Sequence, residues 1–114
     1  MDAITAFQEM QDVLEAIEDV ADVLDGYDVA LPKAEYEYQT KKREVTERLR
    51  GQEPATTLRD TVRGIPEVAE LRRVRDELNY KRQTARQEHT RLMGRMYVLR
   101  DQLNREWNRP SNMA

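Results

Sequence analysis

Apolar residues recur with helical spacing at the start of the chain. Three neighbouring rows repeat every seven residues: Ala3, Met10, Ile17 and Leu24; Ala6, Val13 and Val20; Phe7, Leu14 and Ala21. These rows lie side by side on a helix and form an apolar stripe. Gly26 follows the last repeat, where a left-handed glycine commonly ends a helix. The pattern therefore predicts a helix over residues 2–25.

Proline and glycine divide the remaining chain into three further predicted helices. Pro32 and Gly51 bound a helix over 33–50, and a short helix over 56–63 ends at Gly64. Pro66 suits the first turn of a last helix, because the N–H it lacks would have no partner there. That helix is predicted over 66–108. We therefore expect a single all-α domain over 1–114, an elongated, coiled-coil-like helical hairpin or bundle with one long C-terminal helix.

The last predicted helix has two heptad rows, which form a seam with apolar ends and a cationic middle. One row is Leu71, Leu78, Ala85, Leu92 and Leu99, and the other is Val68, Arg75, Arg82, His89, Met96 and Leu103. Polar residues in such rows set register and partner choice.

The apolar rows of both long segments predict a core or oligomer seam. Its expected residues are Met10, Val13, Leu14, Ile17, Leu71, Leu78, Leu92 and Leu99. One hairpin leaves much of this surface exposed, so we expect the chain to form a homodimer.

Composition excludes several classes of protein. The 114 residues include no cysteine, which rules out a disulfide framework, a thiolate nucleophile and a cysteine-based zinc site. Charged residues make up 36% of the chain and apolar runs are short, so no segment suits a membrane span. The acidic N-terminus differs from a secretory signal. We expect a soluble, cytoplasmic protein.

Charge is distributed unevenly along the chain. The first 32 residues contain nine Asp and Glu and no Lys or Arg, whereas the remaining 82 sum to a charge of +6. Asp12, Glu15, Asp19 and Asp22 lie outside the apolar stripe. They form either a solvated surface, a surface that binds a partner protein, or a mimic of nucleic-acid phosphates.

The long C-terminal segment is rich in basic residues. Candidate nucleic-acid-binding residues are Arg72, Arg73, Lys81, Arg82 and Arg86. Such charge attracts phosphates, but Tyr80 is the sole aromatic residue within the basic stretch 72–95 that a base could stack on. Pairing of these cations with the acidic N-terminal helix is the alternative.

Catalytic and metal-binding patterns are absent from the sequence. His89 is the single histidine, and no His-Glu-x-x-His pattern surrounds it. Acid pairs such as Glu15 with Asp19 lack the Glu-x-x-His motifs of di-metal bundles. We expect no catalytic residue, no metal ligand, no cofactor and no enzymatic activity.

Short motifs are spread over residues 35–107, about two-thirds of the chain. They stand at 35–38, 41–42, 49–50, 54–56, 60, 63–64, 67–69, 71–72, 75–76, 99, 102 and 105–107, and spell EYEY, KK, LR, PAT, D, RG, EVA, LR, RD, L, Q and REW. In this pattern the chain resembles small helical, coiled-coil accessory proteins of tailed bacteriophages and prophages. The resemblance implies a phage-encoded, non-enzymatic accessory factor, which would act in the host cytoplasm.

These observations favour a protein–protein interaction protein. The sharper hypothesis is an inhibitor of a host nucleic-acid-processing enzyme, such as a CRISPR or restriction nuclease, that presents its acidic N-terminal helix to a basic channel. One alternative is a nucleic-acid-binding or recombination accessory protein that uses the basic long helix. Another is a structural or assembly component of the virion.

Overall fold

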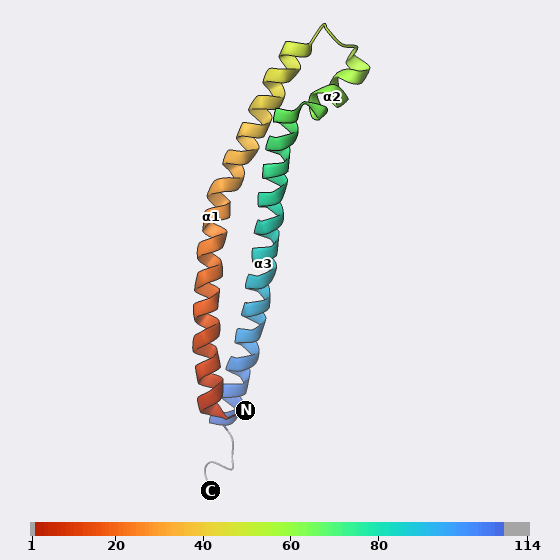
Figure 1. The fold of residues 1–114 in the computed structure, drawn as a ribbon. Coiled ribbons are helices and arrows are strands. Elements are labelled where there is room, and N and C mark those ends of the chain that lie inside the picture. The colour runs from red at the N-terminus through yellow and green to blue at the C-terminus, as the bar shows by residue number, and fades with distance from the viewer. Residues whose placement is uncertain (1, 109–114) are drawn as a thin grey trace. The chain divides into compact units, whose positions relative to one another are not determined.

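The computed structural model describes residues 2–108, which form three α-helices and no strand (Figure 1). Helix α1 spans Ala3–Leu49, α2 spans Ala55–Gly64 and α3 spans Pro66–Trp107. The predicted all-α class and long C-terminal helix are therefore confirmed. The bounds of α2 and α3 agree within one residue with the predicted 56–63 and 66–108.

The predicted break between residues 25 and 33 is wrong. A single helix of 47 residues continues through Gly26 and contains Pro32 in its interior. Gly26 does not take the left-handed conformation expected of a C-terminal cap. The two outer ends of this segment were placed within one residue, since α1 begins at Ala3 and ends at Leu49. Gly51, just beyond that end, has a φ of 86°.

Burial explains why α1 continues past both residues. Inward-facing residues keep alternating spacings of three and four through the whole region: Leu24, Tyr27, Leu31, Ala34 and Tyr38. Pro32 itself is exposed. An interior proline removes one helical hydrogen bond and its ring crowds the preceding turn. The burial of these inward-facing side chains offsets that cost.

Contacts within the chain gather into two compact units. Unit 1 consists of the chain up to Asp25 together with the chain from Thr84 onward, and unit 2 is Gly26–Gln83. Unit 1 thus holds the first half of α1 and the second half of α3. Unit 2 holds the other halves and α2. The single domain expected from the sequence stays a prediction.

The core of unit 1 joins one residue of α1 to two of α3. Val13, Leu92 and Leu99 are buried together. Partly buried residues pack around them: Met10, Ala16, Ile17, Val20 and Met96. Predicted seam residues from both helices therefore meet, with the exception of Leu14, which is 42% exposed. Leu14 belongs to the third apolar row of α1, and one neighbouring helix can cover only the other two rows. A contact of Leu14 with a second copy therefore stays a prediction.

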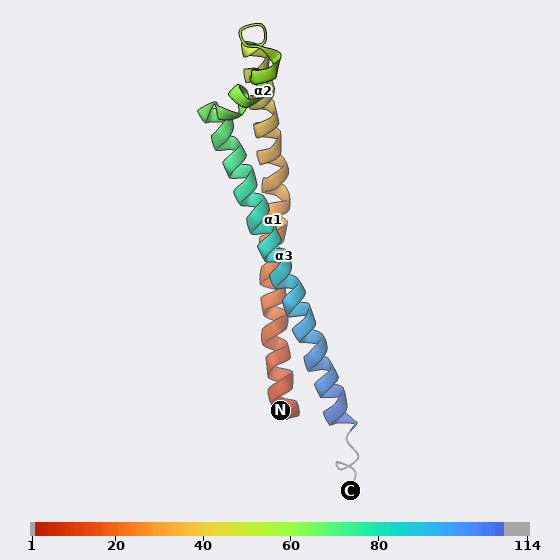
Figure 2. The same cartoon turned by 90° about the vertical axis from the view of Figure 1, so that its right-hand side faces the viewer.

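The core of unit 2 draws on all three helices. Tyr38 and Val45 of α1 are buried with Val62 of α2 and Val68 of α3. The predicted seam residue Leu71 packs against this cluster, and Leu78 is half-buried. Figures 1 and 2 show that the α1 and α3 segments of this unit run in opposite directions. Helix α2 thus completes a core that a two-helix hairpin would leave open.

Replacement of Pro32 by alanine is expected to stabilise the protein. A proline inside a helix costs about 3 kcal/mol relative to alanine, and the exposed site leaves room for the smaller side chain. Gly26→Ala is the matched control, because a Cβ there meets no atom within 4 Å and the expected gain is only about 1 kcal/mol. Urea denaturation followed by circular dichroism measures both gains. A loss of stability in Pro32→Ala would contradict the continuous helix.

An acidic face on α1 and a paired basic surface on α3

The acidic face, defined as Asp12, Glu15, Asp19 and Asp22, lies on the solvent side of α1 in unit 1. All four side chains are exposed. The structure places them there because Val13, Ile17 and Val20, between them in sequence, turn towards α3. This agrees with their predicted position outside the apolar stripe.

No cation neutralises the acidic face within residues 2–108, since none of its carboxylates makes an ion pair there. Glu18 and Asp25 are exposed on the same stretch and likewise have no ion-pair partner in the described chain. At a rise of about 1.5 Å per residue, these six carboxylates follow the helix axis at roughly one per 4 Å. Carboxylates three or four residues apart repel one another and destabilise the helix by roughly 0.2–0.5 kcal/mol per pair.

Three other acids of the N-terminal segment have defined local roles. Arg95 Nε donates a hydrogen bond to Glu9 Oε1 at 2.9 Å within unit 1. In unit 2, Arg82 Nε donates to Asp28 Oδ1 at 2.7 Å. Asp2 Oδ1 accepts a hydrogen bond from the Thr5 N–H at 2.7 Å, and this bond lowers the pKa of Asp2. The sequence suggested pairing between the acidic segment and the basic helix, but not which acids take part.

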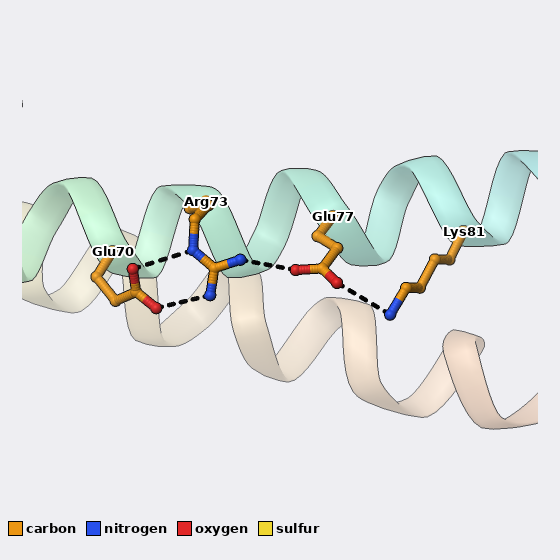
Figure 3. Close-up of polar contacts among 4 residues, drawn as sticks. All are labelled: Glu70, Arg73, Glu77 and Lys81. Atoms are coloured by element: carbon orange, nitrogen blue, oxygen red, sulfur yellow. Dashed lines mark hydrogen bonds and ion pairs between the residues drawn. The ribbon is translucent and has the colours of Figure 1, made fainter.

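Most of the candidate nucleic-acid-binding cations are already paired with carboxylates. Figure 3 shows Glu70, Arg73, Glu77 and Lys81 in one row along α3. Arg73 Nη2 lies 2.7 Å from Glu70 Oε1, and Arg73 Nη1 lies 2.8 Å from Glu77 Oε2. Lys81 Nζ lies 3.0 Å from Glu77 Oε1. Arg82 is paired with Asp28. The glutamates three residues before and four after Arg73 were a sequence signal for this pairing that the charge count alone missed.

Arg72 and Arg86 differ from the other three candidate cations. Arg86 is exposed and makes no ion pair in the described range. Arg72 is half-buried in unit 2, and its Nη1 atom is buried without a hydrogen-bond partner. The sequence did not single out Lys42, Arg59 and Arg63, which line the same cavity as Arg72.

The cationic middle of the α3 rows faces acidic and aromatic groups of α1. Arg75 Nη1 lies 3.4 Å from Glu35 Oε2, and the guanidinium carbon of Arg75 lies 4.4 Å from the centre of the Tyr38 ring. His89 is half-buried in its row. Across residues 2–108, no group of three or more His, Asp or Glu side chains is placed to hold a metal ion.

The carboxylate row on α3 predicts a pH response. Hydrogen bonds from Arg73 lower the pKa of Glu70, and hydrogen bonds from Lys81 and then Arg73 lower the pKa of Glu77. A lowered pKa stabilises the fold above the unfolded glutamate pKa of about 4.3, and that contribution is lost as the pH falls through the folded value. We expect carboxyl-carbon NMR titrations to place both groups below free glutamate. In Arg73→Gln the pKa of Glu70 should return towards the ordinary value, and an unchanged titration would contradict the pairing.

Comparison with known proteins returned no relative: no protein-family model, curated protein or solved structure matches the chain. Among the helices of the described chain, none combines the length and apolar character that a membrane crossing needs.

Proposed function

We propose that this protein acts by binding another protein, and that the acidic face of α1 docks on a basic surface of its partner. The supporting observation is that the carboxylates of this face make no ion pair with the described residues. Six exposed carboxylates stand between Asp12 and Asp25 without an ion pair in the described chain, although the full sequence contains 19 Lys and Arg. Repulsion along the helix has a stability cost, which a basic partner would offset.

The charge spacing favours a partner that ordinarily binds nucleic acid. One strand of duplex DNA has a charge about every 3.4 Å along its axis, and the six carboxylates follow α1 at roughly one per 4 Å. A channel shaped for a phosphate backbone would therefore meet a similar line of negative charge. We propose a nucleic-acid-processing enzyme as the partner class, with inhibition by occupation of its channel. A CRISPR or restriction nuclease of a phage host is the sharpest form of this proposal.

Direct nucleic-acid binding through α3 has weaker support. Arg73, Lys81 and Arg82 each have a carboxylate partner, so phosphates would have to displace those ion pairs. Arg86 is the exposed candidate that makes no ion pair in residues 2–108. Homodimer formation and a role in virion assembly stay predictions, and exposed apolar residues such as Phe7 and Leu14 are consistent with further contacts.

A competition assay distinguishes the two leading functions. A labelled DNA duplex is bound to each of several nucleases with basic channels, and the full chain is then added at about 50 and 200 mM salt, a range over which phosphate contacts weaken strongly. We expect the chain to release DNA from its target nuclease, less effectively at the higher salt, and to leave free DNA unbound. Tight binding of the chain to free DNA, with no release from any nuclease, would contradict the proposal.

A further inference from the structure

Unit 2 contains a cationic cavity where its three helices meet. The cavity measures about 220 Å³ and its charged lining consists of Lys42, Arg59, Arg63, Arg72 and Arg75. The remaining wall is formed by Tyr38, Val62 and Val68. Among the residues that the structure describes, no carboxylate lines it, although Asp and Glu outnumber Lys and Arg in the whole sequence. The fold thus brings five cationic side chains to the wall of one cavity.

Four of the five cations have no ion-pair partner among residues 2–108. Lys42, Arg59, Arg63 and Arg72 make no ion pair within the described residues, whereas Arg75 is paired with Glu35 and Asp76, which lie outside the cavity wall. Elsewhere in the same unit, Lys41, Arg50 and Arg73 each have a carboxylate partner. Like charges held together repel one another, so an anion in the cavity would relieve an interaction that the chain itself does not offset.

Arg72, one of the lining residues, also has a donor that is unpaired within residues 2–108. Nη1 of Arg72 is shielded from solvent and has no hydrogen-bond partner in the described chain. Buried polar atoms of folded proteins nearly always have a partner, and an unpaired one on a charged group is costly. Arg72 therefore lines the cavity with hydrogen-bonding capacity that the described chain does not use.

Tyr38 holds two of the cations in place without using their N–H groups. Its ring centre lies 4.4 Å from the guanidinium carbon of Arg75 and 5.8 Å from Nζ of Lys42. Contacts with the ring face are electrostatic, and the N–H edges of Arg75 are directed to carboxylates outside the cavity wall, Asp76 and Glu35. Tyr38 is only 7% exposed, so it forms a wall of the cavity and offers no free face on which a base could stack.

We propose that this cavity binds the phosphate group of a small molecule, either inorganic phosphate or a phosphate monoester. Arginine forks match the oxygens of phosphate in paired, charge-assisted hydrogen bonds. A dianion also suits four uncompensated cations better than a singly charged carboxylate does. The volume is sufficient, since one water molecule takes about 30 Å³. The site is independent of the acidic face, because its ligand and its residues differ.

Titration of the full chain with inorganic phosphate tests the site. ¹H–¹⁵N NMR spectra are recorded at constant ionic strength, with sodium acetate as the comparison anion. We expect saturable shifts at Arg63 and Arg72, and much weaker ones with acetate. Arg63→Gln and Arg72→Gln should each weaken phosphate binding about tenfold or more, the usual size of a lost charge-assisted hydrogen bond. Arg63 is exposed, so its variant keeps the test valid should Arg72→Gln fail to fold.

Arg48→Gln is the matched control, because Arg48 is an exposed cation of the same unit outside the cavity. It should retain phosphate affinity within about twofold, as expected when only distant, screened charge is lost. Titrations with AMP and adenosine separate the two sources of phosphate: tighter binding of AMP than of phosphate identifies a monoester, and equal binding identifies the free ion. Absence of saturation, equal weakening by Arg48→Gln and Arg63→Gln, or binding of adenosine as strong as that of AMP would each overturn the proposal.

Discussion

Replacement of Asp12, Glu15, Asp19 and Asp22 by their amides is expected to weaken release of DNA from the target nuclease in the competition assay. The four carboxylates are exposed and without ion pairs in the described chain, so their charge is available to a partner. Exposed charge pairs contribute roughly 0.2–1 kcal/mol each. Loss of four together, roughly 0.8–4 kcal/mol, should raise the concentration needed for half-release by about fourfold to several hundredfold.

The fold of this variant should become more stable, because repulsion within the acidic face disappears. Asp12 with Glu15, Glu15 with Asp19, and Asp19 with Asp22 are each three or four residues apart, and such like-charge pairs are unfavourable by roughly 0.2–0.5 kcal/mol. A loss of competition together with a gain in melting temperature would separate binding from folding. A destabilised variant would indicate instead that these side chains support the structure.

A charge-matched control separates the acidic face from net charge. Glu37, Glu44, Glu47 and Asp60 are exposed acids of unit 2, and their replacement by amides also changes the net charge from −3 to +1. This variant should release DNA almost as well as the unaltered chain. Equal loss of competition in both variants would mean that overall charge, and not the acidic face, governs binding.

Leu99→Ala is expected to cost about 2–5 kcal/mol of stability, the usual range for truncation of a buried leucine. Leu99 is 0% exposed and packs with Val13 and Leu92 in the core of unit 1. That loss is a large share of the roughly 5–15 kcal/mol that stabilises a typical folded domain. Chemical denaturation followed by circular dichroism, together with amide exchange in unit 1, measures it.

Val98→Ala is the control for the core substitution, because Val98 neighbours Leu99 on α3 but is 47% exposed. Exposed substitutions usually change stability by less than about 0.5 kcal/mol. Similar denaturation midpoints for the two variants would show that Leu99 is not part of the core that holds α1 to α3.

The sequence was sufficient for features that depend on local rules. Heptad repeats placed Val13, Leu92 and Leu99 on inward-facing rows, and all three are buried together. Pro66 marked the start of α3, and Gly51 the end of α1. The outward position of the acidic face follows from the same periodicity, because side chains three or four residues apart share a side of a helix.

Pairings of charged groups depended on the tertiary structure. Asp28 with Arg82 and Glu9 with Arg95 join residues far apart in sequence, and their choice depends on how α1 and α3 align within each unit. The cationic cavity likewise takes residues from three helices. Its arginines at positions 59 and 63 stand one helical turn apart in the sequence, but nothing local shows that Lys42 and Arg72 face them.

Continuity of α1 is the clearest case in which tertiary contacts prevailed over a local signal. By itself, the sequence determined that the segments on both sides of Pro32 are helical, and an interior proline then favours a break between them. The tertiary structure decided that the two segments are one helix. Inward-facing residues from Leu24 to Tyr38 keep alternating spacings of three and four, and the burial of these side chains outweighs the hydrogen bond lost at a single exposed proline.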